Sequence, residues 1–387
     1  MVKRKLYYKI RKLMKSREAI VITGMRQVGK TTILKQLYKD IASTNKLFFD
    51  LENPLYRRYF EFEDYEKIIQ TLVELGLDKN KPAYLFLDEI QFAKSIPSFV
   101  KYAIDHYQWK FFLTGSSSFY LKNLFNESLA GRKYIFELFP FDFEEFLELK
   151  NIKGRPEKKG EISKASYLIW QKLYDEFVNW GGFPGVILKS TIVEKKRTLE
   201  DIFASYFNKE VIELGDFRNN RVIRDLMLLL LGRTGSKVDF QKFAAELGAS
   251  RASIKEYIHF LEGTYFISLI YPFTKNRDVE IRSTPKVYLC DSGLVSLLSK
   301  IDDGHVFENT IFHQLRTRGK INYYQKKSGV EIDFVLNKSQ SFEVKMNASA
   351  RDIKRLTFLS RELALKNPQI ISHNYNNLKN IKFGFQV

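Results

Sequence analysis

Residues 19–32 read Ala19-Ile-Val-Ile-Thr-Gly24-Met-Arg-Gln-Val-Gly29-Lys30-Thr31-Thr32. An apolar strand here runs into the pattern Gly-x-x-x-x-Gly-Lys-Thr, and a helical pattern follows. Gly24 and Gly29 permit a tight turn whose backbone N–H groups face one anion, and the positive end of the next helix adds to that attraction. Lys30 can reach the β- and γ-phosphates of a nucleotide, and the Thr31 hydroxyl can bind Mg²⁺. The residues expected to contact ATP are Gly24, Met25, Arg26, Gln27, Val28, Gly29, Lys30, Thr31 and Thr32.

A second segment predicts that the nucleotide is hydrolysed as well as bound. It reads Pro82-Ala-Tyr-Leu-Phe-Leu-Asp88-Glu89-Ile90, a buried-strand pattern that ends in two acids. Asp88 would hold Mg²⁺ through water, and Glu89 lies where a general base could polarise the attacking water. Acids at strand ends are also commonly solvated and inert, but this pair follows a phosphate-binding loop with a helix between them.

A third strand pattern, Trp109-Lys-Phe-Phe-Leu-Thr114-Gly115, ends in Ser116-Ser117-Ser118. A hydroxyl here would lie beside the γ-phosphate as a sensor, and we include Thr114 among the expected nucleotide contacts. Ser and Thr after a strand are also ordinary helix caps, so both interpretations stay open.

Composition indicates a globular chain. The 387 residues suffice for two or three domains, and 44% are hydrophobic. The longest apolar run, Leu226 to Leu231, is far too short to span a membrane. Residues 1–17 are basic but lack the apolar core of a secretion signal. The one cysteine, Cys290, rules out an intramolecular disulfide and fits a reducing cytoplasm.

The net charge of +18 favours a polyanionic partner, with nucleic acid, and DNA in particular, ahead of a membrane surface. A Lys-rich bias of the whole proteome would give the same charge without such a partner. A second copy of the chain or another protein could also be a partner.

Residues 17 to about 140 alternate between strand and helix patterns. The alternation predicts a P-loop NTPase sheet of parallel strands covered on both faces, in a first domain of residues 1–150. Such a sheet binds its ligand at the carboxyl ends of the strands. The expected strands are Ala19–Thr23, Lys46–Leu51, Ala83–Asp88, Trp109–Thr114 and Tyr134–Leu138.

The sequence predicts a helical region over residues 151–282. Its first part, residues 151–163, is a polar break, and the helical pattern starts after it. Gly181-Gly182-Phe183-Pro184 interrupts it like a hinge. Residues 233–275 resemble a winged helix, with one helix at Asp239–Leu247, a second at Ser250–Leu261 and strand-like wing material after them. Arg251 and Lys255 would share the exposed face of the second helix, where they suit contact with DNA. Winged helices in ATPases also serve as lids or protein-docking modules.

Residues 283–387 predict a third, mixed α/β domain. Residues 330–336 and 341–345 alternate polar and apolar side chains on either side of a short polar turn. A hairpin that pairs Asp333 with Glu343 would bring these carboxylates together beside Lys345, near Glu331. Such a group can hold Mg²⁺ and orient water for attack on a phosphodiester, and Glu308 could add a fourth polar group. A solvated sheet face with balanced charges is the alternative.

The ordered set of motifs over nearly the whole chain resembles the archaeal and bacterial AAA+-type ATPases that carry a C-terminal domain of unknown function. Besides the phosphate loop, the set comprises Leu87-Asp88-Glu89-Ile90-Gln91, Leu113-Thr114-Gly115-Ser116-Ser117, Leu129-Ala130-Gly131-Arg132, Gly181-Gly182-Phe183-Pro184, Asp291-Ser292-Gly293-Leu294, Gly329-Val330-Glu331-Ile332-Asp333-Phe334 and Glu343-Val344-Lys345.

The resemblance implies an ATPase core, a winged helix and a C-terminal domain similar to PD-(D/E)XK nucleases. It assigns Asp333, Glu343 and Lys345 to the nuclease core. Arg132 becomes a candidate for stabilising the transferred phosphate, in cis or from a neighbouring subunit, or else a structural arginine. Such chains often carry an arginine shortly before the Asp-bearing strand, where this chain has Gln325 and lysines.

The leading interpretation is therefore an ATP-driven enzyme that acts on DNA, in which ATP turnover gates a nuclease-like domain. The alternative is an ATP-controlled switch or docking protein whose C-terminal domain binds nucleic acid or protein without cleaving. A nucleotide-dependent protein-remodelling factor is a third possibility, which the charge of +18 disfavours.

Overall fold

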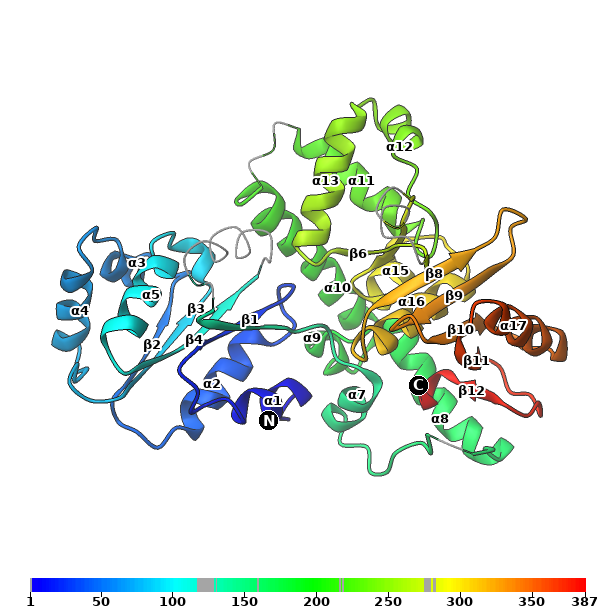
Figure 1. Cartoon of the computed structure of the whole chain (residues 1–387), viewed down its shortest axis with the longest axis horizontal. Coiled ribbons are helices and arrows are strands. Elements are labelled where there is room, and N and C mark those ends of the chain that lie inside the picture. Colours follow the sequence, from blue (N-terminus) through cyan, green and yellow to red (C-terminus); the bar gives the residue numbers. More distant parts are fainter. Residues whose placement is uncertain are drawn as a thin grey trace. The chain divides into compact units, whose positions relative to one another are not determined.

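The computed structural model describes residues 2–116, 129, 131–158, 160–215, 217, 219–274, 280 and 283–387 (Figure 1). The chain forms two compact units. The first comprises Met1–Phe139 with Gly263–Tyr265, and the second comprises Pro140–Glu262 with Phe266–Val387. Apart from Gly263–Tyr265, the predicted helical region and C-terminal domain, residues 151–282 and 283–387, thus fall within one unit, and the boundary between them stays a prediction.

The first unit is built on a parallel sheet of five strands in the order β2-β3-β4-β1-β5. The strands are β1 (Ala19–Thr23), β2 (Lys46–Asp50), β3 (Ala83–Asp88), β4 (Trp109–Gly115) and β5 (Lys133–Glu137). The apolar side chains of β1, β3 and β4 are buried almost throughout, as inner strands of a parallel sheet between helices require, whereas Tyr134 and Ile135 of the edge strand β5 are exposed. The predicted P-loop NTPase fold class is confirmed, and the strand boundaries differ from those expected by one residue at most.

Helices cover this sheet on both faces. They are α1 (Lys5–Arg11), α2 (Lys30–Asp40), α3 (Pro54–Arg57), α4 (Tyr65–Glu74) and α5 (Ile96–His106), with short 3₁₀ turns η1 (Arg58–Phe60) and η2 (Ile90–Phe92). Tyr38 of α2 packs edge-on against Phe86 on one face, and Phe86 stacks on Phe112 with ring centroids 4.6 Å apart.

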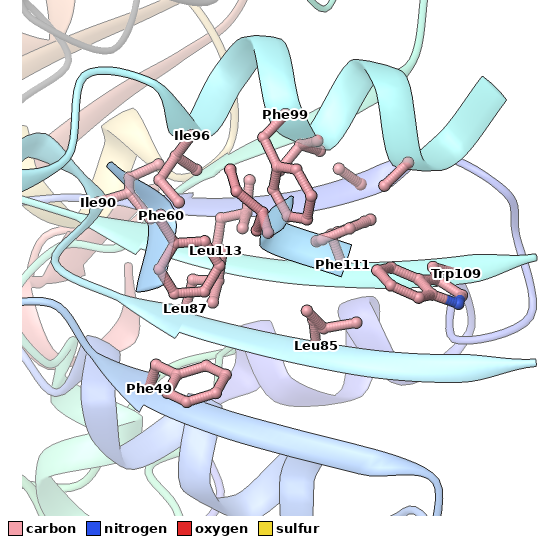
Figure 2. Packing of buried hydrophobic residues seen from close by; sticks show 14 of the residues in the cluster. Phe49, Phe60, Leu85, Leu87, Ile90, Ile96, Phe99, Trp109, Phe111 and Leu113 are labelled. Atoms are coloured by element: carbon pink, nitrogen blue, oxygen red, sulfur yellow. The ribbon is translucent and has the colours of Figure 1, made fainter. Parts of the chain in front are cut away.

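The opposite face packs against α5. Figure 2 shows Ile96 and Phe99 of this helix above Leu85, Phe111 and Leu113 of the sheet. These five side chains are fully buried, and each contributes about 1.5–3 kcal/mol by leaving water. This packing fixes the carboxyl ends of β1, β3 and β4, where the predicted nucleotide-binding residues lie.

The second unit begins with helices. They are α7 (Phe143–Leu149), α8 (Lys164–Trp180), α9 (Pro184–Ile187), α10 (Ile192–Tyr206), the π-helical η3 (Phe207–Ile212), α11 (Asn220–Leu231), α12 (Phe240–Leu247) and α13 (Arg251–Gly263). Strands β6 (Ile267–Ile270) and β7 (Lys286–Leu289) follow and pair antiparallel.

A second five-stranded sheet, in the order β12-β11-β10-β9-β8, completes this unit. Its elements, with their helices, are α15 (Ser292–Leu298), α16 (Asp303–Arg316), β8 (Ile321–Gln325), β9 (Glu331–Leu336), β10 (Gln340–Lys345), α17 (Ala350–Glu362), β11 (Lys366–Ser372), β12 (Ile381–Phe383) and the 3₁₀ turn η4 (Gly384–Gln386). β9 and β10 form the predicted hairpin, in which Ser341 pairs with Val335 and Phe342 with Phe334.

The Gly181-Gly182 segment is a fixed joint, which corrects its interpretation as a hinge. The Gly182 N–H donates to Asp291 Oδ2 at 2.7 Å, and the Gly293 N–H donates to Asp291 Oδ1 at 2.8 Å. A Cβ on Gly181 would lie 1.9 Å from Asp291 Oδ1, so only glycine fits there. The Gly181-Gly182 motif and the Asp291-Ser292-Gly293 motif therefore hold the end of α8 against the start of α15.

Among the helices formed by the described residues, none combines the length and apolarity needed to cross a lipid bilayer.

Candidate nucleotide-binding site and carboxylate cluster

The phosphate-binding loop runs from the end of β1 to the start of α2. Gly24 has a φ of 150°, and a Cβ there would lie 2.1 Å from the carbonyl oxygen of Leu138. Gly29 has a φ of 101° and precedes the first turn of α2. Both glycines thus serve the backbone turn that the sequence predicts, one by close approach and one by its left-handed conformation.

Lys30 lies across the loop that precedes it. Its ammonium donates to the carbonyl oxygens of Gly24 at 2.9 Å and Met25 at 3.1 Å, and it lies 4.0 Å from Glu89 Oε1. The side chain is 3% exposed. A buried ammonium held by loop carbonyls is positioned to meet a phosphate in the same loop.

The structure brings Asp88, Glu89 and Thr114 together at the ends of β3 and β4. The Thr114 hydroxyl donates to Asp88 Oδ1 and accepts a hydrogen bond from the Glu89 N–H at 3.1 Å. Asp88 and Thr114 are buried. Thr114 thus holds the two acids in place, a role that the sequence did not reveal.

The two acids have opposite pKa shifts. Burial raises the pKa of Asp88, and hydrogen bonds with Thr114 and Thr31 oppose this shift without cancelling it. Burial acts in the same direction on Glu89, but the Lys30 charge and a hydrogen bond from Gln91 outweigh it and lower the pKa of Glu89. Glu89 is therefore a carboxylate at neutral pH, as a general base must be.

The oxygen groups at this site fit Mg²⁺. Thr31 at the start of α2 hydrogen-bonds Asp88, so a hydroxyl and a carboxylate converge beside the loop. Magnesium prefers hard oxygen ligands and keeps several of its waters. The elevated pKa of Asp88 reflects a buried carboxylate that a cation would stabilise.

Two residues near the loop were missed by sequence reasoning. Arg4, just before α1, donates to the Val28 carbonyl at 2.8 Å and to the Phe139 carbonyl at 2.9 Å, so it braces the loop. Gln91 donates to Glu89 Oε2 at 2.5 Å and to Ser116 Oγ at 3.0 Å. Neither role has a local sequence signal. Ser117, Ser118 and Ala130 lie outside the described residues.

Arg132 does not join this site within one chain. It precedes β5, and its carbonyl accepts from the N–H of Ala19, the first residue of β1. Its guanidinium pairs with Asp105 at 2.8 Å. Because the phosphate loop follows the other end of β1, about 15 Å along the strand at ~3.3 Å per residue, the structure excludes a contribution of Arg132 in cis.

The second unit gathers four acids that we call the carboxylate cluster: Glu308, Glu331, Asp333 and Glu343. Asp333 and Glu343 come next in the hairpin after the Phe334–Phe342 pair, on β9 and β10. Both are buried, and the Val344 N–H donates to Asp333 Oδ2 at 2.8 Å. Burial and the neighbouring Asp333 charge raise the pKa of Glu343. The predicted register thus brings the two carboxylates together.

Cations hold one oxygen of Glu343. Lys345 lies 3.0 Å from Glu343 Oε1, and Arg355 of α17 donates to the same oxygen. The other oxygen, Oε2, is buried and has no hydrogen-bond partner among the described residues. Burial acts to lower the pKa of Lys345, but the charges of Asp333 and Glu343 raise it on balance.

A buried lysine that sequence reasoning missed occupies the other side of the cluster. Lys286, at the start of β7, lies 3.3 Å from Glu331 Oε2 and is 5% exposed as a residue. Burial acts to lower its pKa, but the charges of Glu308, Asp333 and Glu331 outweigh burial and raise it. Two residues further along β7, the Tyr288 hydroxyl donates to Glu308 Oε1 at 2.6 Å.

The predicted DNA-contacting residues lie on α13. Arg251 and Lys255 are both exposed, as expected, and the Lys255 ammonium lies 5.8 Å from the centre of the Phe240 ring. Gln325, which stands near the position where an arginine was expected, donates to Glu331 Oε2 at 3.4 Å.

Three family models match successive parts of the chain. An AAA domain matches residues 16–147, the domain of unknown function DUF8612 matches residues 171–305, and the domain of unknown function DUF4143 matches residues 303–386. The AAA match covers most of the unit that carries the phosphate loop, Asp88 and Glu89, and extends eight residues beyond Phe139.

Related proteins match along most of their length. The uncharacterized protein MJ1544 of Methanocaldococcus jannaschii is 30% identical over 379 residues, which cover 92% of this chain and 82% of that protein. An uncharacterized protein of Haemophilus influenzae is 26% identical, covering 86% of this chain and 84% of that one. A solved structure of the Aeropyrum pernix Orc1 protein in complex with DNA matches with a TM-score of 0.35 and 12% identity, covering 81% of this chain and 92% of that chain. The chain therefore belongs to the same family as MJ1544, and its residues 16–147 match an AAA domain.

Proposed function

We propose that this protein is a Mg²⁺-dependent ATP hydrolase that acts on DNA, and that ATP turnover gates a nuclease-like site in its second unit. The observation that carries the proposal is the arrangement of Asp88, Thr114 and Glu89 beside Lys30. One buried hydroxyl fixes both acids, and one buried ammonium faces the loop that would hold the phosphates.

Each residue has a definite task in this proposal. Lys30 and the loop N–H groups bind the β- and γ-phosphates. Thr31 and Asp88 would hold Mg²⁺, which neutralises charge on the phosphates when bound. Glu89 accepts a proton from the attacking water, and Gln91 keeps its carboxylate oriented. Thr114 keeps Asp88 and Glu89 at a fixed separation, and a contribution from Arg132 would come from a neighbouring copy of the chain.

The test of this proposal measures ATP affinity and turnover separately. Lys30→Ala should weaken ATP binding roughly 10- to 100-fold, because charge-assisted hydrogen bonds to phosphate are lost. Lys35→Ala is the matched control, since Lys35 lies on the same helix and is exposed. Equal ATP affinity in the two variants, or turnover that persists in EDTA, would rule the proposed site out.

Action on DNA is supported by the net charge of +18 and by the two exposed cations on α13. In this proposal residues 233–275 act as a winged helix within a helical region, residues 151–282. DNA affinity should fall steeply as salt rises, because each neutralised phosphate releases counterions. Arg251→Glu with Lys255→Glu should weaken binding and lower the salt slope by about two.

The matched control for this pair is Lys35→Glu with Lys39→Glu, which makes the same change of net charge on exposed positions of α2. If both double variants weaken DNA binding equally, α13 makes no direct contact. The general charge of the surface would then carry the binding.

The nuclease-like proposal concerns residues 283–387. Asp333 and the unpartnered Oε2 of Glu343 suit one divalent ion, which would polarise a phosphodiester when bound. Among the described residues no three acid, histidine or cysteine side chains could hold a metal by themselves, so water and DNA oxygens would complete the shell. Lys345 would balance negative charge beside that position.

An observation also favours the alternative of a switch or docking protein. The other oxygen of Glu343 is already held by Lys345 and Arg355, which leaves fewer carboxylate oxygens for a metal ion. A nuclease assay with Mg²⁺ or Mn²⁺, with and without ATP, on supercoiled, linear and branched DNA separates the two. Cleavage supports the nuclease, and DNA binding without cleavage under every condition supports the switch.

A further inference from the structure

The carboxylate cluster contains more negative charge than one metal position needs. Glu308 comes from α16, Glu331 and Asp333 from β9 and Glu343 from β10. Asp333 and Glu343 are buried, and Glu308 and Glu331 are half-buried. Buried carboxylates are stable as anions only with a cation beside them. In acidic sites that act on phosphodiesters, a pair of divalent ions often supplies this positive charge.

Here the chain supplies part of that charge itself. Lys286 enters from β7, a strand outside the five-stranded sheet, and its side chain is 6% exposed. Its ammonium pairs with Glu331 Oε2 at 3.3 Å and interacts electrostatically with Glu308 and Asp333. The Lys286 ammonium also lies over the ring of Tyr323, 5.6 Å from the ring centre, an attractive cation–π arrangement.

The surrounding residues fix the acids toward this lysine. Tyr288, on the same face of β7 two residues later, binds Glu308 Oε1. Gln325 donates to the same Glu331 oxygen that Lys286 contacts. Asp333 and Glu343 remain to share a divalent ion. The buried oxygen without a hydrogen-bond partner among the described residues is Glu343 Oε2, whereas Lys345 lies at Glu343 Oε1.

We propose that Lys286 is a built-in cation that takes the place of a second divalent ion in the carboxylate cluster. It is a positioning residue, because it holds Glu308, Glu331 and Asp333 around a single remaining metal position. The expected number of metal ions rests on the proposed nuclease-like function. The role of Lys286 as an internal cation does not depend on whether the domain cleaves DNA.

The test counts Mn²⁺ bound to the full chain, freed of nucleotide so that the phosphate loop holds none, by the electron paramagnetic resonance of free Mn²⁺. The natural chain should bind one Mn²⁺ ion, and the Asp333→Asn variant should bind none. Lys286→Met should bind one ion more, and Lys286→Arg should not. Lys326→Met is the matched control, since Lys326 pairs with Glu362 at 2.6 Å on the surface, and it should behave like the natural chain.

Thermal unfolding gives an independent readout. In EDTA, Lys286→Met should melt lower by about 6 °C or more, because carboxylates are left buried without their cation, and Mn²⁺ should restore much of the loss. No gain of Mn²⁺ together with no Mn²⁺-dependent stabilisation would overturn the inference. So would two Asp333-dependent ions in the natural chain.

If Lys286→Met does not fold, the double variant Lys286→Met with Glu331→Gln decides. It removes one charge of each sign, so it should fold in EDTA if Lys286 acts through its charge. A double variant that also fails to fold overturns the inference. The natural chain could also cleave no DNA and bind no Mn²⁺, while Lys286→Met binds one ion. That result would contradict the nuclease-like function and support the role of Lys286.

Discussion

In the first unit, the buried Lys30 lies on two backbone carbonyls and 4.0 Å from one carboxylate, whereas in the second unit the buried Lys286 lies among three carboxylates. The charge of Lys30 is thus only partly balanced within the chain, so it can attract the phosphates of a ligand. Lys286 pairs with Glu331, and the charges of Glu308 and Asp333 also act on it. The two buried lysines therefore differ in their surroundings, and in our proposals Lys30 binds an external anion whereas Lys286 neutralises internal acids.

The largest effect is expected from Asp333→Asn, which keeps the shape of the side chain and removes its charge. It should abolish any metal-dependent DNA cleavage, because one of two carboxylates at the metal position is lost. ATP hydrolysis should stay within about twofold, since the phosphate loop lies in the other unit. Cleavage and ATPase rates measured on one preparation check this.

The control for that variant is Glu362→Gln, an acid of α17 that pairs with Lys326 at the surface. It should leave both activities unchanged. If Asp333→Asn cleaves DNA as well as the Glu362 variant does, the carboxylate cluster is not a nuclease site.

A second prediction contrasts the half-buried Glu89 with the buried Asp291. Glu89 has Lys30 beside it, whereas Asp291 is held by backbone N–H groups alone, and burial raises the pKa of Asp291 to about 6. The folded chain therefore binds this proton more tightly than the unfolded chain. Local stability around Asp291 should fall by about 3 kcal/mol as pH rises from about 4 to about 6.

Hydrogen exchange at the amides of β7 and α15, followed between these pH values, measures that loss. Asp291→Asn cannot ionise, so its local stability should be nearly independent of pH over the same range. Identical pH profiles for the variant and the natural chain would show that Asp291 does not titrate there.

A smaller effect is expected from Thr114→Val, which keeps the shape of the side chain and removes the hydroxyl between Asp88 and Glu89. Asp88 loses a hydrogen bond worth about 1–1.5 kcal/mol, so the Mg²⁺ concentration for half-maximal ATP turnover should rise roughly tenfold. Ser116→Ala, which loses a contact with Gln91 only, should change it much less. Equal Mg²⁺ dependence in the two variants would remove Thr114 from this role.

The two sites also differ in how far the sequence predicts them. The nucleotide site follows from short contiguous segments, because a strand, a glycine turn and a helix are local structures that place Gly24, Lys30 and Thr31 together. Asp88 could be added because parallel strands end at the same edge of a sheet. The hairpin of Asp333 and Glu343 was predictable for the same reason, since alternation and a short turn fix the register.

The missed residues reach their sites by tertiary packing. Lys286 begins a short apolar strand far along the chain from Asp333, and Arg355 reaches Glu343 from a helix. One signal was available: a lysine and a tyrosine alternate in Lys286-Val-Tyr288-Leu, which is unusual for a strand buried along its whole length. The roles of Arg132 in cis, from a neighbouring subunit or as a structural arginine stayed open in the sequence, because its motif does not reveal which end of β5 it occupies.

The most direct test of ATP hydrolysis by the first unit uses the Glu89→Gln variant. Two quantities are measured on it: the single-turnover rate at which it hydrolyses bound ATP, and its affinity for ATP. Glutamine keeps the shape and the contact with Gln91 but cannot accept a proton. Turnover should fall by about 10²- to 10⁴-fold, with ATP affinity changed no more than about threefold. Turnover equal to that of the natural chain, with ATP bound normally, would contradict Glu89 as the general base and the proposed hydrolytic site with it.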